Sequence, residues 1–469
     1  MKKTLAFLVC LIIVFTSLTI VTANEIYLQG DDVRFSVKKE VGDRKYLEGV
    51  NIDTTIDAKG TLLWKTDFTP LGSTKTDLSF HKLSYPIDQG RSYFGLSFNN
   101  NSDIMGVGSI FEKAGLNINE IKNSLTENGE TKTVTIKMKD YFDYYPMIID
   151  LDLPGNNISW NYGVFDEVGE YYSDMPKERM NGFIKAIEDF LKIPVLDNDI
   201  REWKIEKSIG GYSYGSTWIN SFSFYSYNAV FSDKCYFTFN NRVEDYDNGT
   251  SVTVDTSQIP GGYGIYVLPF DEKTVYYEQI KNVYPINGES TVIRMFPNTE
   301  MGQIYLMLHE NDKYIYKIID EKTMTDICSI EIFDYTDFDY VECANKDDYM
   351  IFCKNDYEIK VVSKNEKGEY TVAMECVIPE EHEAWAAYPY SAAHAFDGER
   401  LVLCYDITHN YYEGIRNNCE LDILVITNEG IVYYSRWDCS LGEMIHENSY
   451  YSNFCNFSYY GESVKVSIE

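Results

Sequence analysis

Four short strand-like segments follow one another between residues 338 and 377, with a turn after each of the first three. In the second segment, Tyr349, Ile351 and Cys353 alternate with other residues, so they fall on one side of a strand. Asn355-Asp356 suits a tight hairpin turn before the third segment. The same-side residues of the fourth segment are Tyr370, Val372, Met374 and Cys376. The stretch predicts a four-stranded antiparallel meander, which must pack against other sheets to cover its two faces.

Two similar groups of four segments flank this meander. One comprises residues 291–296, 303–308, 313–319 and 325–332, and the other comprises residues 391–396, 401–407, 421–427 and 431–437. The three groups start 47 and then 53 residues apart, near the repeat length of β-propeller blades. We therefore expect an all-β fold, a β-propeller of seven or eight four-stranded antiparallel blades. Several separate domains are the alternative for a chain of this length.

The two ends of the chain contain strand-like segments that fit a closed ring. Residues 25–28 and 33–38 follow the N-terminal leader, and residues 453–459 and 463–468 end the chain. Ring folds often complete one blade from both termini, because this removes exposed sheet edges. We expect residues 24–469 to form a single propeller domain in which both termini share one sheet.

Two segments change from strand-like to helical spacing. Residues 108–125 place apolar side chains in a helical stripe despite Gly115. Residues 176–192 are the clearer case, since Pro176 fits the first turn and Met180, Phe183 and Ile187 recur at helical spacing. Both are expected as short helical insertions near 108–125 and 176–192.

The first 23 residues have the features of a secretory signal peptide. Lys2 and Lys3 precede an apolar run over residues 5–15, and Val21-Thr22-Ala23 suits a cut after Ala23. An uncleaved leader that remains as a membrane anchor is the alternative. We expect an extracellular or cell-surface location and no membrane span after cleavage.

The chain is strongly acidic, with 73 acidic and 41 basic residues and a net charge of -32. Such a surface repels phosphate backbones and anionic lipid headgroups, so we expect no nucleic-acid partner. Cations, cationic polymers and neutral glycans remain compatible with it. The acidity alternatively serves only to keep the protein soluble.

Nine of the ten cysteines lie after the leader, and the odd number leaves at least one outside any internal disulfide. No pair has the C-x-x-C spacing of a zinc or redox site. Several lie in strand-like segments, as Cys353 and Cys404 do. Disulfide formation and burial as small apolar side chains both account for them.

Candidate catalytic motifs are sparse. Residues 211–215 match the G-x-S-x-G pattern of a nucleophile elbow around Ser213, but no good helix follows, so a glycine-rich loop between strands explains the match better. None of the histidines has metal-ligand spacing; they are His81, His309, His382, His394, His409 and His446. We assign no catalytic and no cofactor-binding residue.

Calcium is the metal with the best sequence support. Residues 245–249, Asp-Tyr-Asp-Asn-Gly, resemble the start of a calcium loop, but the closing glutamate is missing, so a polar hairpin turn is the better interpretation. Asp334, Asp337 and Asp339 form a second acidic group, and residues 380–383 form a third around His382. Metal ligands therefore stay unassigned, and calcium is an open alternative to no cofactor.

Aromatic residues are unusually frequent, with 40 Tyr, 25 Phe and 6 Trp. In tyrosine doublets such as Tyr433-Tyr434, neighbouring rings point to opposite sheet faces, so we expect one ring of each pair to remain partly exposed. Packing between blades explains most of them. Loop tyrosines such as Tyr411, Tyr412 and Tyr450 are candidates for contact with a protein or glycan.

One stretch resembles a known group of proteins. Residues 139–155, with Tyr141-Phe142-Asp143-Tyr144-Tyr145 leading into a strand-like run, are similar to segments of uncharacterised, secreted, strand-rich proteins of Gram-positive bacteria. The likeness extends to residues 190–196 and to the C-terminal half. It implies an extracellular location and carries no activity.

The sequence favours a secreted, non-catalytic β-propeller that binds a protein or carbohydrate at one face. A propeller glycoside hydrolase that uses carboxylates is the first alternative, and a structural component of the envelope is the second. An enzyme should gather several carboxylates with Arg, Lys or His. A binding module should instead expose an aromatic patch.

Overall fold

A computed structural model provides the structure of the chain. It describes residues 11–19, 33–58, 62–80, 95–99, 111, 114–145, 148–152, 177–218, 225–245, 250–271, 275–336, 340–346, 348–355, 357–379, 392–406, 420–440, 456–457 and 464–469. The chain divides into two compact units. Unit 1 comprises Met1–Tyr85 and Asp337–Glu469, and unit 2 comprises Pro86–Thr336.

The fold is all-β, and its larger sheets are four-stranded antiparallel meanders of the β-propeller blade type, as predicted. The predicted 338–377 meander consists of β20 (Val341–Lys346), β21 (Tyr349–Lys354), β22 (Glu358–Lys364) and β23 (Tyr370–Val377). The preceding group consists of β16 (Thr291–Asn298), β17 (Gln303–Glu310), β18 (Lys313–Asp320) and β19 (Thr325–Asp334). The number of blades, seven or eight, stays a prediction.

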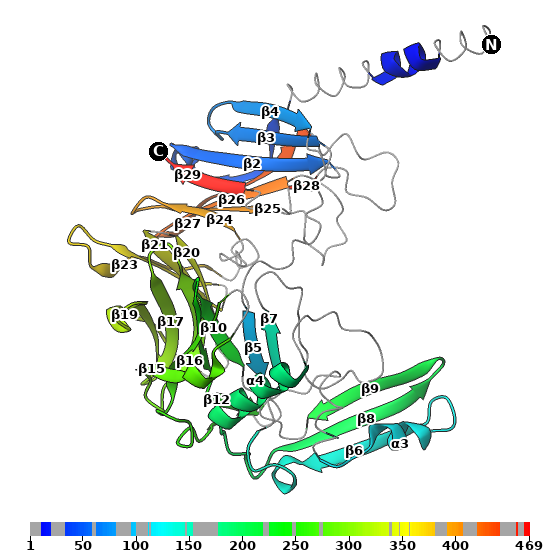
Figure 1. The fold of residues 1–469 in the computed structure, drawn as a ribbon. Helices are drawn as coiled ribbons and strands as arrows, with labels where there is room; N and C mark the ends of the chain where they lie inside the picture. The colour runs from blue at the N-terminus through cyan, green and yellow to red at the C-terminus, as the bar shows by residue number, and fades with distance from the viewer. Residues whose placement is uncertain are drawn as a thin grey trace. The chain divides into compact units, whose positions relative to one another are not determined.

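Unit 1 contains two further sheets, which include the first and last strands of the chain that the structure describes (Figure 1). One consists of β24 (Ala393–Phe396), β25 (Leu401–Asp406), β26 (Glu420–Thr427), β27 (Gly430–Cys439) and β1 (Phe35–Gly42). The other consists of β2 (Val50–Ala58), β3 (Leu62–Phe68), β4 (Thr74–Phe80), β28 (Asn456–Phe457) and β29 (Val464–Ile468). A short 3-10 turn, η1 (Arg44–Leu47), joins β1 to β2.

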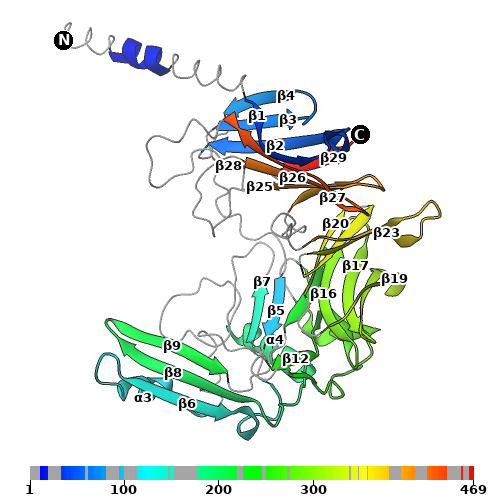
Figure 2. The same ribbon diagram turned by 180° about the vertical axis from the view of Figure 1, so that it is seen from behind.

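In each of these two sheets, a strand from one end of the chain pairs with a strand from the other end. β1 pairs with β27 near the C-terminus, and β29 pairs with β2 near the N-terminus, as both ribbon views show (Figures 1 and 2). The predicted partners, residues 33–38 and 463–468, lie in different sheets as β1 and β29, but each of the two sheets combines strands from the N-terminal and C-terminal parts of the chain. Residues 25–28 lie outside the described residues. Closure of residues 24–469 into a single ring stays a prediction.

Two hydrophobic cores make unit 1 a stack of three sheets. The core between the β1/β24–β27 sheet and the β2–β4 sheet includes Trp64, Val425 and Trp437. A second core joins the opposite face of the β1/β24–β27 sheet to the β20–β23 sheet and includes Ile359 and Leu424. The middle sheet is thus apolar on both faces, as for a strand layer buried between neighbours.

Burial on both faces corrects one expectation about the tyrosine doublets. Tyr433 is 0% exposed and Tyr434 is 2% exposed, although their rings point to opposite faces of β27. The prediction of one partly exposed ring is wrong for this pair, because a core lies on each side of the sheet. Tyr411, Tyr412 and Tyr450 lie outside the described residues.

Unit 2 combines the β16–β19 sheet with a second four-stranded sheet and three smaller sheets. The four-stranded sheet consists of β10 (Ser226–Val230), β11 (Lys234–Phe239), β14 (Gly264–Pro269) and β15 (Lys281–Pro285). A three-stranded sheet consists of β6 (Thr131–Lys137), β8 (Ile200–Ser208) and β9 (Gly211–Trp218). The two-stranded sheets are β5 (Gly95–Asn99) with β7 (Ile148–Asp152), and β12 (Arg242–Asp245) with β13 (Thr250–Thr253).

The predicted helical insertions both lie in unit 2, with η2 (Met138–Asp140) and η3 (Tyr277–Gln279) as additional short turns. α4 (Lys177–Phe190) matches the 176–192 prediction and packs Ile187 into the core of this unit. Among the described residues of the 108–125 stripe, α3 (Ile118–Asn123) is helical, and Phe111 also has helical backbone. Gly115 has a φ of +70°, and Leu116 N donates to Phe111 O, which is a helix C-terminal motif.

Candidate functional site

Two cross-strand pairs of charged residues lie at the end of the sheet where β26 begins and β27 ends. Glu420 lies opposite Asp438, and Asp422 lies opposite Arg436. Side chains at alternate positions share a face, so all four project from one side of the sheet. Trp437, which lies between the pairs in sequence, is buried in the core on the other side.

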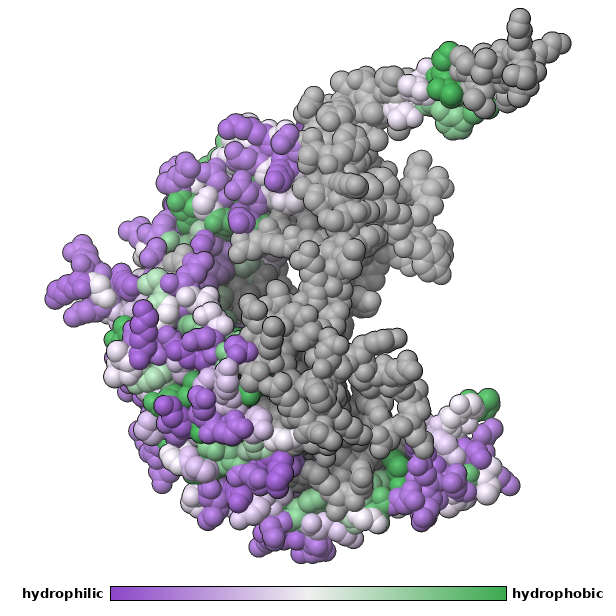
Figure 3. All heavy atoms as spheres, viewed as in Figure 1, coloured by the Kyte–Doolittle hydropathy of each residue, from purple (hydrophilic) through white to green (hydrophobic). Residues whose placement is uncertain are grey.

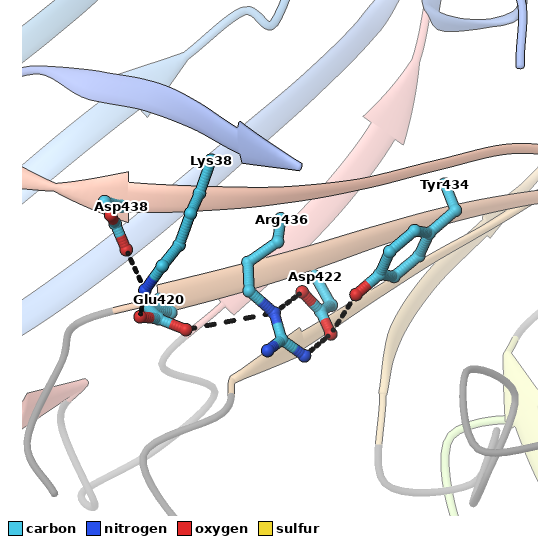
Figure 4. A network of polar contacts seen from close by, with 6 residues as sticks. All are labelled: Lys38, Glu420, Asp422, Tyr434, Arg436 and Asp438. Carbon is cyan, nitrogen blue, oxygen red and sulfur yellow. Dashed lines mark hydrogen bonds and ion pairs between the residues drawn. The ribbon is translucent and has the colours of Figure 1, made fainter. Parts of the chain in front are cut away.

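A β-bulge in β1 brings a lysine to the same side. The register of β1 with β27 shifts between Val37 and Lys39, which makes Lys38 an additional residue. Lys38 Nζ lies 2.6 Å from Glu420 Oε1 and 3.5 Å from Asp438 Oδ1. Figure 4 shows the resulting group, which we call the charge cluster: Lys38, Glu420, Asp422, Tyr434, Arg436 and Asp438.

Arg436 binds Asp422 through two parallel hydrogen bonds. Nε donates to Oδ1 at 2.8 Å, and Nη2 donates to Oδ2 at 2.8 Å. Tyr434 donates to the same carboxylate at 3.1 Å, and Arg436 Nε also lies 3.8 Å from Glu420 Oε2 (Figure 4). This bidentate geometry is among the strongest charge-assisted interactions of side chains.

The cluster raises the pKa of both Lys38 and Asp438. Burial, together with the neighbouring Glu420, raises the pKa of the Asp438 carboxyl, and Lys38 opposes this effect. The hydrogen bond to Glu420 raises the pKa of Lys38. Glu420 itself is only 5% exposed, whereas the side chain of Asp438 is 37% exposed. Asp438 is therefore the more exposed carboxyl of this pair, and its pKa is raised.

Chemically, the charge cluster can hold its strands together or exchange a proton. Both of its cations bind carboxylates inside the cluster, which links β1, β26 and β27 across two strand boundaries. Acid–base catalysis on glycosides also uses a pair of carboxyl groups, of which the general acid has a raised pKa. The cluster is thus the place in unit 1 where several carboxylates meet an Arg and a Lys.

A second candidate lies in unit 2, where the segment that resembles secreted proteins runs beside residues 193–195. Tyr145 N donates to Ile193 O at 2.9 Å, and Val195 N donates to Asp143 O at 3.1 Å. These bonds fix the backbone as a short antiparallel pair. Tyr145 points inward and is 3% exposed, and burial raises the pKa of its phenol.

The neighbouring tyrosines point outward. Tyr144 is 39% exposed and Tyr141 is 48% exposed, and Lys192 Nζ lies 5.9 Å from the centroid of the Tyr144 ring. We call these three residues the tyrosine patch. Rigid, partly exposed tyrosines with a polar tip are typical of surfaces that bind glycans and proteins. This patch was missed from the sequence, because the doublet at Tyr144-Tyr145 was only one of many aromatic pairs.

The G-x-S-x-G motif does not form a nucleophile elbow. Residues 211–218 form one continuous strand, β9, that pairs with β8 along its length, and Ser213 lies opposite Glu206. A nucleophile elbow needs a sharp turn from a strand into a helix. The motif is therefore part of a strand, and the preferred interpretation as a loop between strands is also wrong.

Two of the six histidines that the sequence analysis considered as metal ligands, His309 and His394, lie in the described residues. His394 Nδ1 lies 2.9 Å from the Tyr349 hydroxyl, and His309 Nδ1 lies 3.2 Å from Arg242 Nη1. The remaining histidines, His81, His382, His409 and His446, lie outside these residues.

The structure describes only some of the residues that were candidates for binding calcium. Asp245 and Thr250 pair at the end of the β12–β13 hairpin, and residues 246–249, 337, 339 and 380–383 lie outside the described residues. Asp334 forms an ion pair with Lys313. In the described ranges, no group of three or more His, Cys, Asp or Glu side chains is arranged to hold a metal ion. Calcium stays a prediction.

Cysteines occur mainly inside strands. Cys235 and Cys376 are buried free thiols, and Cys328 is a partly buried one. Burial raises the pKa of Cys376 to about 12. These positions favour the role of a small apolar side chain over a disulfide.

Within the ranges that the structure covers, no helix is long and apolar enough to cross a bilayer.

Comparison with known proteins identifies no family. No protein-family model and no curated protein matches the chain. Among solved structures, the Hsv2 protein of Kluyvelomyces marxianus is 7% identical, with a TM-score of 0.19 over 44% of this chain and 62% of that chain. A proposed 6-phosphogluconolactonase of Bacteroides uniformis is 10% identical, with a TM-score of 0.27 over 82% of this chain and 95% of that chain. Structural similarities this weak do not identify a related protein. The strand pairing of the chain itself defines the blade architecture.

Proposed function

We propose that this chain is a secreted, non-catalytic binding protein that presents the tyrosine patch to a protein or carbohydrate ligand. The observation that carries the proposal is the exposure of Tyr144 from a backbone segment that is hydrogen-bonded to residues 193–195, together with that of Tyr141, whose N donates to Met138 O. A ring held in place loses little conformational entropy when a ligand covers it.

The charge balance of the surface supports this choice of ligand. Hydrophilic residues dominate the described part of the face in Figure 3, as expected for a chain with a net charge of -32. Such a surface disfavours polyanions but not neutral glycans or peptides without excess negative charge. The charge cluster of unit 1 is less suited to ligand capture, because Lys38 and Arg436 already bind carboxylates of the cluster.

An array of oligosaccharides and immobilised peptides, probed with the purified chain, tests the proposal. We expect saturable binding that Tyr141→Ala and Tyr144→Ala each weaken about tenfold or more, as for residues that contribute about 2 kcal/mol to an interface. Tyr225→Ala is the matched control, since Tyr225 is 45% exposed in the same unit. Equal loss in the control, or binding that the patch variants leave intact, contradicts the proposal.

A glycoside hydrolase is the second candidate, favoured by one specific observation. Asp438 has a raised pKa beside the buried Glu420, which is the arrangement expected of a general acid and its partner carboxylate. Release of reducing sugar from an array hit would support this candidate if Asp438→Asn and Glu420→Gln abolish it. Asp348→Asn, at an exposed turn of unit 1, should leave it unchanged. Binding without product release excludes the hydrolase for that ligand.

A further inference from the structure

A histidine of unit 2 is buried between an arginine and a tyrosine. His309 lies near the end of β17 and is 6% exposed. Its ring stacks on Tyr335, with centroids 3.6 Å apart and planes 17° apart. Arg242 Nη1 lies 3.2 Å from His309 Nδ1, and the Arg242 guanidinium also lies 5.4 Å from the centroid of the Tyr335 ring. The three side chains form one stacked group.

The chemistry of arginine fixes the protonation state of His309. A guanidinium remains charged and can only donate hydrogen bonds, so His309 Nδ1 must accept. The imidazole is therefore neutral, with its proton on Nε2. That nitrogen lies 4.0 Å from Asp312 Oδ1, beyond hydrogen-bond distance.

Arg242 is the first residue of β12, which pairs only with β13 among the described strands. A two-stranded hairpin is marginally stable without further support. Its base is held by a hydrogen bond from Val254 N to Asn241 O at 2.8 Å. The contacts of Arg242 with His309 and Tyr335 add an attachment to the β16–β19 sheet.

The geometry points to a pH-sensitive latch, in which protonation of His309 Nδ1 expels Arg242 and releases the β12–β13 hairpin from the β16–β19 sheet. Protonation replaces the acceptor at Nδ1 with a donor and places a second positive charge 3.2 Å from the guanidinium. An unperturbed histidine takes up its proton near pH 6.5. The latch is therefore closed at neutral pH and opens as the pH falls.

Among the described residues, the charged groups of the neighbouring β17–β18 turn and β19 offset this repulsion little. The β17–β18 turn carries Glu310, Asp312 and Lys313, and Lys313 pairs with Asp334 of β19. Asp312 comes closest, but its side chain is 96% exposed, and water screens a carboxylate in that position. On the aromatic side, Tyr314 and Tyr335 stay neutral in this pH range.

Hydrogen exchange measured by mass spectrometry on the full chain tests the latch. After correction for intrinsic exchange rates, we expect amides of residues 242–245 and 250–253 to exchange about tenfold faster at pH 5.5 than at pH 7.5, a change equivalent to about 1.4 kcal/mol. Amides of β17 and β18 should remain protected at both values, which shows that the unit stays folded. Exchange in the hairpin that does not change with pH overturns the inference.

Two variants separate the latch from general acid sensitivity. His309→Asn places an amide oxygen near the position of Nδ1 but cannot titrate, so we expect the hairpin to be protected at both pH values. Arg242→Gln removes the cation, and we expect fast exchange at both values. His394→Asn in unit 1 is the control and should keep the wild-type pH dependence of the hairpin. A pH dependence that persists in His309→Asn would refute the role of this residue.

Discussion

Glu420 and Asp438 lie directly opposite each other on β26 and β27, so two carboxyl groups occupy one cross-strand pair. Like charges at such positions repel each other, and here Lys38 lies 2.6 Å from the first and 3.5 Å from the second. Arg436 Nε also lies 3.8 Å from Glu420, but burial and the neighbouring Glu420 still raise the pKa of Asp438. The pair consequently retains a proton more strongly than two separate carboxyl groups would.

Asp438→Asn should stabilise the protein at neutral pH. Because the folded state raises the pKa of Asp438, the ionised form is disfavoured above that pKa, and this destabilisation disappears as the pH falls toward the ordinary value of about 3.9. We expect the free energy of unfolding to rise by on the order of 0.5 kcal/mol at pH 7, since the side chain is partly exposed. Urea unfolding at pH 7 and pH 4 checks this, with a smaller gain at pH 4.

Asp348→Asn is the matched control for that measurement, because Asp348 lies in an exposed turn of the same unit. It should change the free energy of unfolding by less than about 0.5 kcal/mol at either pH. A destabilised Asp438→Asn at pH 7 would show that ionised Asp438 strengthens the cluster instead of weakening it.

The bidentate bond between Asp422 and Arg436 should dominate the stability of the charge cluster. A double-mutant cycle with Asp422→Asn and Arg436→Gln should give a coupling energy of about 1–2 kcal/mol, reduced from the buried case because Arg436 is 33% exposed. The pair of Lys360 and Glu375 is the control, at 2.9 Å with Glu375 60% exposed. Its coupling energy should stay below about 1 kcal/mol.

Gly42 should tolerate no side chain. Its φ is +99°, and a Cβ atom there would lie 2.2 Å from Val432 O on the neighbouring strand. Gly42→Ala should therefore lower the free energy of unfolding by about 2–4 kcal/mol, through backbone strain and overpacking. Gly368 has a φ of +78° but nothing within 4 Å, so Gly368→Ala should lower it by only about 1 kcal/mol. Equal losses in the two variants would mean that the strand contact has no effect.

Cys376 should resist alkylation in the folded protein. Burial raises the pKa of its thiol to about 12, so almost no thiolate exists at pH 8, and the side chain is 5% exposed. Mass spectrometry after iodoacetamide treatment should find Cys376 modified only in denaturant. The partly buried Cys328 is the internal control and should react faster in the folded state. Rapid native labelling of Cys376 would indicate local opening of β23.

The strand meanders were predictable because their signals are local. Asn311 and Asp312 both have positive φ values, 52° and 57°, as a two-residue hairpin turn requires, and both residue types favour that conformation. The alternation of Tyr349, Ile351 and Cys353 likewise placed all three in the core between sheets, as predicted. Each of these signals depends on neighbours in sequence.

Bulges were not predictable, and they changed which side chains share a face. Val361 pairs with Met374 but Val362 pairs with Val372, so Ala373 is an additional residue. Val372 therefore lies on the face opposite Met374, and the predicted single face of the fourth segment is wrong. The bulge at Lys38 has the same effect on β1.

The charge cluster could not be predicted from the sequence, because its members come from distant parts of the chain. Lys38 and Glu420 are 382 residues apart, and nothing local distinguishes Glu420 among 73 acidic residues. The tyrosine patch depends on which of two adjacent rings faces inward, and this was decided by hydrogen bonds between residues 143–145 and 193–195. Such long-range pairing leaves no pattern in a single sequence.

The pairing of N-terminal with C-terminal strands in unit 1 constrains the order of assembly during synthesis. β1 must wait for β27, which ends at Cys439, and β2 must wait for β29, which ends at Ile468. Unit 2 is contiguous in sequence and contains its own core, so it is able to mature while synthesis continues. β1 and β2 are thus synthesised early but gain these partner strands late, so unit 1 completes its sheets after unit 2 is able to fold.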